Sequence, residues 1–497
     1  MNGKSKNLLV TPDQVSNSSI PIAYDESVTH DNARKKKYNS YTCFISENLD
    51  LEVLLRTNPP AIPKFHIDKL VYMAGLLIEI PLRKKDVIMD YVPINSALVQ
   101  RRVRDYRKYL DYLIDCGVVE EDRQYISGAK SRGFRYAKEY VTATRVCTLN
   151  ENRALLKSLS QFKEINYSFH SGNFESATLK SSFEANKRDL THVSKWLNHK
   201  LTIDYDPALE FLIQLREEER LDPKIENCDQ RFQLRQAALL KFHKGVFLPN
   251  EDSTAGRLHS ALTQIKGVLR PFIRYDGKRL IAVDIVNSQP YLAITLLNPI
   301  RYGTNNIFNL IININPKNNF LLYPIMLVKT IEAASIAHNT KLYIDLVTSG
   351  NFYEEFGLML KKEGIIDEKL DDKETRNKAK NATFSALFNS NNAISFCKEM
   401  NIFKRTFPEV YAVFKMVKLG KGHHNTLAIL LQSLEALLIL HKACKILSDE
   451  NPNVPILTLH DSIITTEGNE EYVYTVMKNV LTEAIGVPPV LKIERWE

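Results

Sequence analysis

Cysteine is scarce in this chain of 497 residues, and its six copies are scattered: Cys43, Cys116, Cys147, Cys228, Cys397 and Cys444. No CxxC pair and no Cys/His cluster at zinc spacing occurs, which argues against a disulfide-stapled scaffold and against a structural zinc site. Glycine (18 residues) and proline (20 residues) are too few for a collagen-like or low-complexity chain. We therefore expect a globular protein with reduced thiols.

Long apolar runs are also missing. No stretch of about 18 apolar residues is found, and residues 1–19 are polar, without the apolar core of a signal peptide. We expect a soluble, cytoplasmic protein that contacts no membrane. The 66 basic and 58 acidic residues leave a formal net charge of +8, which suits a polyanionic partner such as nucleic acid.

The composition and residue pattern of the sequence change three times along the chain. Residues 1–46 are polar, with a basic run at 34–37, and we expect a flexible arm there. A basic module is expected over 47–145, a mostly helical, thumb-like or connecting region over 146–250, and the chemistry in 251–497. This number of segments agrees with a length of roughly 100–200 residues per domain.

The basic module combines a helix with a hairpin. Residues 69–80 are expected to be helical, and residues 94–116 place apolar side chains at helical spacing and end before Gly117, a good helix stop. Residues 118–136 then predict two short strands around a basic, glycine-containing tip. The module resembles the winged-helix domains of plasmid and mobile-element replication proteins, and its cations would contact DNA phosphates, with Arg101, Arg104 and Arg132 as candidates. The alternative is a helical packing module with a solvated basic face.

Two carboxylates end apolar strands in the C-terminal half. Asp284 closes the short strand expected at 280–284, and Asp461 follows His460 in the turn of an apolar hairpin over 456–464. Two such carboxylates could hold two Mg²⁺ ions in a phosphoryl-transfer centre. Each aspartate taken alone is more often a turn or capping residue.

Four residues between these aspartates recur every fourth position of a segment, 373–387, that lacks Gly and Pro. They are Arg376, Lys380, Phe384 and Phe388. The cations could hold a triphosphate while a ring packs on a sugar or base. A stripe packed in the core, with two capping cations, explains the same pattern.

The order of these pieces resembles the family A DNA polymerases and their relatives, the single-subunit phage-type RNA polymerases. Asp284 resembles the aspartate of motif A, the four-residue stripe resembles motif B, and His460 with Asp461 resembles motif C. Residues 255–260 resemble the primer-contact segment that includes Arg257, and Gln432 resembles the glutamine on the template side. The resemblance covers about half of the chain.

The resemblance implies an α+β fold, a right-hand polymerase with palm and fingers in 251–497 and a thumb-like helical region before them. It implies that Asp284, Asp461 and the main-chain carbonyl of Ile285 hold two Mg²⁺ ions, with Mn²⁺ as a substitute. It further implies that Lys380 donates a proton to pyrophosphate. The nucleotide would contact Arg376, Lys380, Phe384, Phe388 and Tyr291, and the primer and template would contact Arg257, Gln432 and His460.

Several positions depart from the DNA polymerase pattern. Ser288 lies four residues after Asp284, and Ser462 replaces a glutamate in motif C, both as in the RNA polymerase branch. Motif B ends in Phe388 instead of tyrosine, and Tyr291 falls where a sugar-selecting glutamate would lie. The choice of sugar is therefore open, with deoxynucleotides favoured because Tyr291 is bulky. An Asn-rich stretch at 305–319 is either a surface insertion or a loop that contacts nucleic acid.

From these features we expect a template-directed DNA polymerase of a phage, plasmid or mobile element. It would add dNTPs to a primer 3′-hydroxyl on a DNA primer-template, with replication accessory proteins as further partners. No paired-carboxylate constellation of a proofreading exonuclease stands out in the first 250 residues, so we expect no proofreading. The alternatives are an RNA-synthesising enzyme, either a primase or a single-subunit RNA polymerase, and a non-catalytic DNA-binding replication initiator.

Overall fold

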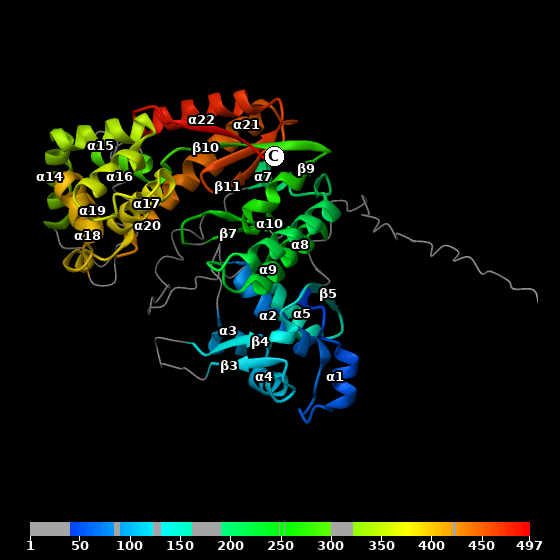
Figure 1. Ribbon diagram of the computed structural model, residues 1–497. Helices are drawn as coiled ribbons and strands as arrows, with labels where there is room; N and C mark the ends of the chain where they lie inside the picture. Colours follow the sequence, from blue (N-terminus) through cyan, green and yellow to red (C-terminus); the bar gives the residue numbers. More distant parts are fainter. Residues whose placement is uncertain are drawn as a thin grey trace, which may run out of the picture. The chain divides into compact units, whose positions relative to one another are not determined.

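The structure is a computed structural model (Figure 1). It describes residues 40–83, 90–122, 131–161, 190–247, 249–252, 254–299, 322–420 and 424–497. These residues belong to one compact unit, Ser40–Glu497. The basic run at 34–37 and the Asn-rich stretch at 305–319 lie outside the described residues.

The N-terminal part of this unit is built from short helices and antiparallel strands. Its elements are β1 (Tyr41–Ser46), α1 (Leu51–Thr57), α2 (Ile67–Leu82), β2 (Val92–Pro93), α3 (Ser96–Gln100), α4 (Tyr106–Asp115), β3 (Val119–Glu121), β4 (Gly133–Tyr136), β5 (Thr144–Leu149) and α5 (Arg153–Gln161). The strand order is β2-β4-β3 in one sheet, and β1 pairs with β5 in another. Residues 41–46, expected to belong to the arm, are thus a strand, because their apolar side chains are buried against α2.

The helix expected over 94–116 is interrupted. Residues 101–105 form a turn between α3 and α4, where Val103 is fully buried and Arg102 donates a hydrogen bond to the hydroxyl of Tyr72. The expected end at Gly117 is confirmed, since this residue has φ +71°. Strands β3 and β4 confirm the expected hairpin strands, whereas its tip at 123–130 lies outside the described residues.

One helix is shared by the N-terminal part and the rest of the unit. The region contains α7 (Thr191–Ser194), β6 (Leu201–Ile203), α8 (Tyr205–Leu221) and α9 (Cys228–His243). Leu234 of α9 packs into the N-terminal core, whereas Phe242 packs against the main sheet. Buried Lys241 pairs with buried Glu79 of α2 at 3.1 Å and also donates to Gln264 at 3.1 Å. This polar contact ties three elements together.

The largest sheet has the strand order β11-β12-β10-β9-β6, with β13 along the other edge of β10. Its strands are antiparallel: β9 (Ile273–Tyr275), β10 (Lys278–Ile285), β11 (Leu457–Leu459), β12 (Ser462–Thr466) and β13 (Leu491–Arg495). Strand β6 comes from the region that the sequence predicted to be mostly helical. It joins the sheet because Leu201 and Ile203 fill the same core as Ala282.

The two faces of this sheet are covered by different helices (Figure 1). Val283 and Ile285 of β10 point toward the core shared with α22 (Glu470–Ile485), whereas Leu280 and Ala282 point toward α9 and α10 (Ala261–Gln264). The alternation of side chains along a strand therefore places Asp284 on the second face, together with Ala282.

The rest of the C-terminal half is helical and holds the largest core. Its helices are α11 (Ser288–Ala293), α14 (Leu322–Ser335), α15 (His338–Ser349), α16 (Phe352–Lys362), α17 (Asp372–Phe388), α18 (Lys398–Thr406), α19 (Pro408–Val417), α20 (Thr426–Glu435) and α21 (Cys444–Glu450). Helix α17 confirms the helix predicted at 373–387, and β10 to β12 confirm the predicted strands. Short strands β7 (Asn250–Glu251) and β8 (Leu258–His259) pair with each other.

A π-helical stretch, Ala436–Ala443, joins α20 to α21. The combined segment Thr426–Glu450 is long and apolar enough to cross a membrane, although the sequence showed no uninterrupted apolar run of that length. Most of its apolar stretch, 61%, is buried within the fold, as in the core helix of a soluble protein. Length and composition alone are weak evidence for a membrane span.

Candidate active site

The structure brings the two predicted aspartates to one end of the main sheet. Asp284 lies opposite Ser462 in the pairing of β10 with β12, and Asp461 directly precedes Ser462 in the turn after β11. The Ser462 hydroxyl donates a 2.5 Å hydrogen bond to Oδ1 of Asp284. Ser462, which stands where the DNA polymerase pattern has a glutamate, therefore orients the carboxylate of Asp284.

The two carboxylates repel each other. Burial, followed by the nearby charges of Asp461 and Glu494, raises the pKa of Asp284 to about 6, against the hydrogen bond from Ser462 and the charge of Arg270, which lower it. Glu494 belongs to β13, where it pairs with Ala282, and Arg270 lies over the ring of Trp496 at 5.5 Å. A cation bound between the carboxylates would relieve this repulsion, so the donor set fits a divalent metal ion.

The turn between β11 and β12 is strained. His460 has φ +57°, in the left-handed region, at a hairpin position that usually contains glycine. The ring of His460 lies 6.0 Å from that of His259 in an edge-on arrangement. Asp461 is the second residue of this two-residue turn.

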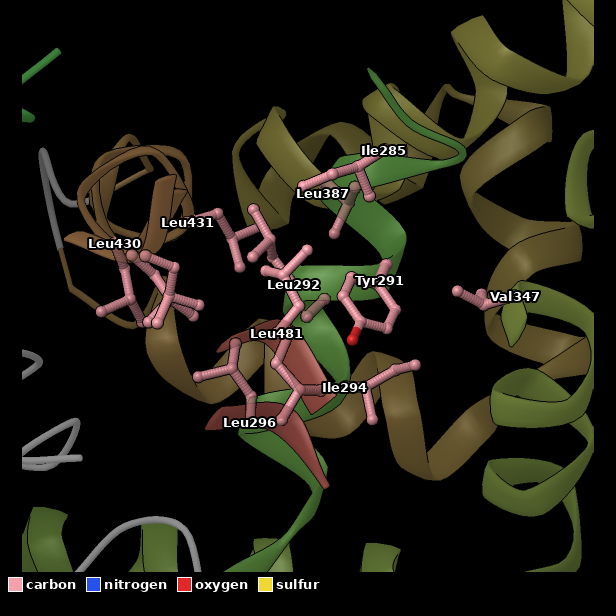
Figure 2. Close-up of a cluster of buried hydrophobic side chains, with 14 of the residues drawn as sticks. Ile285, Tyr291, Leu292, Ile294, Leu296, Val347, Leu387, Leu430, Leu431 and Leu481 are labelled. Atoms are coloured by element: carbon pink, nitrogen blue, oxygen red, sulfur yellow. The ribbon is translucent and has the colours of Figure 1, made fainter. Parts of the chain in front are cut away.

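The direction of the Ile285 carbonyl follows from the hydrogen bonds at the end of β10. Its side chain is buried, as Figure 2 shows, and Val286 donates its N–H to Val490 on the β13 side. Because successive residues of a strand direct their hydrogen-bonding groups to opposite edges, the Ile285 carbonyl points to the other edge, where the His460–Asp461 turn lies.

Helix α17 presents its predicted stripe on a partly exposed face. The core side of the helix consists of small or apolar residues: Thr375, Ala379, Ala382, Thr383, Ala386 and Leu387. On the other side, Lys380 lies 5.7 Å from the ring of Phe384, and the rings of Phe384 and Phe388 are 5.4 Å apart. The cations of the stripe are thus outside the core, although both rings pack partly against it.

Tyr353 connects α17 to the aspartates, and no motif in the sequence marked it. Arg376 lies over its ring at 5.3 Å and pairs with Glu354 at 2.8 Å. Burial raises the pKa of Tyr353, Arg376 lowers it and the charge of Asp461 raises it. Tyr353 therefore contacts Arg376 of α17 and lies within electrostatic range of Asp461.

A second missed residue, Glu435, is buried beside Asp461. Its side chain is 1% exposed, and its Oε2 accepts hydrogen bonds from Arg257 at 2.7 Å and from Gln289 at 2.8 Å. Burial, together with the charge of Asp461, raises the pKa of Glu435 to about 7, although the charge of Arg257 lowers it. The only sequence signal was an acidic residue within an apolar helical run. Arg257 is thus tied to α20.

Gln432 lies one turn before Glu435 on the same face of α20 and is partly exposed. It therefore lies on the same side of the helix as the Arg257 contact.

Tyr291 does not lie in this site, contrary to the sequence interpretation. It is 1% exposed, its hydroxyl donates to the carbonyl of Val487 at 2.8 Å, and its ring is surrounded by the side chains of Leu292, Ile294 and Leu481 (Figure 2). The helix α11 starts at Ser288, and its turn points Gln289 toward Glu435 and Tyr291 into the core. The number of residues between Asp284 and Tyr291 did not reveal that the Tyr291 side chain points into the core.

The cations of the N-terminal module fall into two groups. Arg107 and Arg132 both pair with Glu121, at 2.8 and 2.9 Å. The hydrogen bond from Arg107 lowers the pKa of Glu121 to about 2. Arg101 and Arg104 are exposed in the turn before α4, and within the described part of the chain neither has an acidic partner. The two groups therefore differ in the charge they can offer to a polyanion.

One trio of metal-ligating side chains lies elsewhere. Among the described residues, His66, Asp68 and Glu151 have ligand atoms within 4.8 Å of one another. His66 accepts a hydrogen bond from the Asp68 N–H, and Asp68 accepts from the N–H groups of Glu151 and Asn152. These contacts satisfy the starts of α2 and α5, so the trio is explained by helix capping.

No protein-family model matches the chain, and no curated protein matches its sequence. A solved structure described as the POL domain of Pol1 from M. smegmatis in complex with DNA primer-template and dNTP is similar in structure. The similarity covers 69% of this chain and 74% of the other, at 12% sequence identity and a TM-score of 0.33. A similarity of this degree does not establish a shared function.

Proposed function

We propose that this protein is a template-directed nucleotidyltransferase that extends a primer 3′-hydroxyl with nucleotides. The observation that carries the proposal is the meeting of Asp284 and Asp461 at one end of an antiparallel sheet, with Tyr353, whose ring contacts Arg376 of α17, within electrostatic range of Asp461. The linear order of the motifs agrees with family A polymerases. A DNA polymerase without proofreading is the form we favour, in a replication protein of a phage, plasmid or mobile element.

Asp284, Asp461 and the Ile285 carbonyl would hold the metal ions. Bound Mg²⁺ supplies a lowered pKa for the primer hydroxyl and stabilises the charge that develops on the α-phosphate. The chain's own contribution is orientation, because the Ser462 hydroxyl holds one oxygen of Asp284. The repulsion between the two carboxylates keeps the site attractive to cations.

The exposed face of α17 would bind the incoming nucleotide. Arg376 and Lys380 would contact the phosphates, and Phe384 and Phe388 would pack on the sugar or base. Lys380 would donate a proton to the leaving pyrophosphate. Arg257, which donates a hydrogen bond to Glu435, would contact the primer-template together with Gln432 and His460.

The position of Tyr291 bears on the choice of sugar. Its bulk was the reason to favour deoxynucleotides, and the ring lies in the core. This observation favours a second candidate function, an RNA-synthesising primase or single-subunit RNA polymerase, which Ser288 and Ser462 also suit.

The N-terminal module would anchor the enzyme on duplex DNA. The succession α2, β2, α3, α4, β3, β4 with strand order β2-β4-β3 is the order of elements in a winged helix. Arg101 and Arg104, which have no acidic partner among the described residues, offer positive charge just before α4. This arrangement supports contact with DNA phosphates. Arg132 would contribute less, because Glu121 already pairs with it.

The deciding experiment is extension of a labelled primer on a DNA template with Mg²⁺, run in parallel with dNTPs, with NTPs and without primer. The matched variants are Asp284→Asn and, as a control, Asp449→Asn, which removes an exposed carboxylate paired only with Lys445 one turn away on α21. Extension with dNTPs that is lost only in Asp284→Asn supports a DNA polymerase. Incorporation of NTPs moves the assignment to the second candidate, and duplex binding without synthesis leaves a non-catalytic initiator.

A further inference from the structure

We propose that Lys418 and Asn391 are positioning residues that fix the C-terminal turn of α17, and with it the rings of the nucleotide-binding stripe. The inference rests on the proposed function for its kinetic consequence, but its structural part does not.

Lys418 is a buried cation that the chemistry does not use. It follows the last residue of α19, is 2% exposed, and donates hydrogen bonds from Nζ to the carbonyls of Ala386 (2.7 Å) and Asn389 (3.0 Å). These carbonyls flank Phe388, the last residue of α17. The last carbonyls of a helix have no partners within it, and a cation there also suits the helix dipole.

Asn391 makes the reciprocal contact. Its side-chain amide donates to the carbonyls of Lys415 (3.0 Å) and Lys418 (3.3 Å) at the end of α19. The C-terminal end of α17 is therefore bound by Lys418, which follows α19, and the C-terminal end of α19 is bound by Asn391, which follows α17. We call this pair of contacts the α17 latch, formed by Lys418 and Asn391.

Lys418 of the α17 latch is a charged residue at a position where an apolar side chain would be easier to bury. Burial lowers the pKa of Lys418 to about 8, and across the described ranges no carboxylate pairs with it. Burying an ammonium group without a counter-charge is unfavourable unless its hydrogen bonds are made. We infer that this lysine serves the geometry of the α17 end more than its stability.

The other end of α17 is held independently. Asp371 caps it by accepting from the Glu374 N–H at 2.7 Å, and α16 lies so close that a Cβ on Gly357 would be 2.7 Å from the Thr375 side chain. The Arg376 end is thus fixed by α16, and the Phe388 end by the latch. Releasing the latch should move Phe384 and Phe388 without displacing Arg376.

The test compares Lys418→Met and Asn391→Ala with Lys415→Met, which changes an exposed lysine of the same helix. In the full-length protein, Lys418→Met should raise KM for the incoming nucleotide about tenfold, with kcat and primer-template affinity changed less than about threefold. Asn391→Ala should shift KM in the same direction by a smaller factor, and Lys415→Met should have no effect. Unchanged KM in a folded Lys418→Met or Asn391→Ala variant would overturn the proposal.

A second readout needs no activity. Amide hydrogen exchange of the last turn of α17 should be faster in Lys418→Met and Asn391→Ala than in the wild type, while exchange in its first turn stays the same. If wild-type protein made no product, the proposed function would fail and this exchange would still decide on the latch. Equal exchange in all variants would reject it. If Lys418→Met does not fold, the partly exposed Asn391 keeps both measurements available.

Discussion

Ser462 and Asp284 face each other across two antiparallel strands, and the serine hydroxyl donates a 2.5 Å hydrogen bond to the aspartate. The bond fixes one carboxylate oxygen of a residue whose pKa is raised to about 6 by burial and by Asp461. The repulsion between the carboxylates of Asp461 and Asp284 should affect the stability of the fold as well as the activity. It disfavours the charged form of Asp284 when no cation is bound.

The first prediction concerns Asp461→Asn. Removing its charge lowers the pKa of Asp284 and should raise the free energy of unfolding at pH 7 without Mg²⁺ by about 0.5–2 kcal/mol, while synthesis is lost. Urea unfolding and primer extension measure the two effects. Mg²⁺ should raise the Tm of the wild type and not that of the variant, and equal stabilisation of both by Mg²⁺ would argue against a metal site there.

The second prediction concerns the pH dependence of the Arg257–Glu435 pair. The pKa of Glu435 is raised to about 7 in the folded state, so between its ordinary value near 4.5 and 7 the folded protein binds the additional proton, and stability falls as the pH rises through this window. Arg257→Met raises this pKa further. It should therefore destabilise by about 3–5 kcal/mol at pH 8, where a buried carboxylate is left unpaired, and by clearly less at pH 6.

The control for this prediction is the double variant Arg257→Met with Glu435→Gln. It removes the titrating group, so its free energy of unfolding should lack the decrease between pH 6 and pH 8 that Glu435 causes in the wild type and in Arg257→Met. Urea unfolding at both pH values checks this, and an equal loss for Arg257→Met at the two pH values would show that Glu435 does not titrate in this range.

The third prediction separates free from paired cations in the N-terminal module. Replacing Arg101 and Arg104 by Gln should lower duplex affinity and reduce the slope of log K against log salt by about 2, since each phosphate that is no longer neutralised reduces it by about 0.9. Arg135→Gln is the matched control, because Arg135 pairs with Glu120 and Asp90. A salt titration by fluorescence anisotropy measures both, and equal slopes in all variants would assign the basic face to solvent.

The fourth prediction tests the face of α17. Lys380→Met should raise KM for the nucleotide at least tenfold, since one charged hydrogen bond to phosphate amounts to about 1.5–3 kcal/mol, with primer-template affinity preserved. Lys378→Met changes an exposed lysine of the same helix outside the stripe and should have little effect. Steady-state kinetics on a saturating primer-template distinguishes them, and equal effects would mean that the helix contributes only general positive charge.

Local patterns predicted much of the secondary structure. Alternating apolar residues indicated β10 and the β11–β12 hairpin, and the absence of Gly and Pro indicated α17, because these signals depend on near neighbours in the chain. The helix expected over 94–116 is interrupted by a turn at residues 101–105, where Arg102 donates a hydrogen bond to the hydroxyl of Tyr72 on α2. The position of such an interruption depends on contacts with other elements, and the apolar spacing alone does not reveal it.

The sequence by itself determined the candidate residues for the chemistry: two aspartates that end apolar strands, a stripe of cations and rings on one helix, and their order along the chain. Only the tertiary structure decided which of them meet. Sheet pairing brings Asp284 to Ser462 across 178 positions of sequence, and α20 supplies a buried Glu435 to Arg257. The direction in which α11 leaves β10 turns Tyr291 into the core. These outcomes follow from long-range packing, in which the free energy of burying a side chain depends on partners that are distant in the chain.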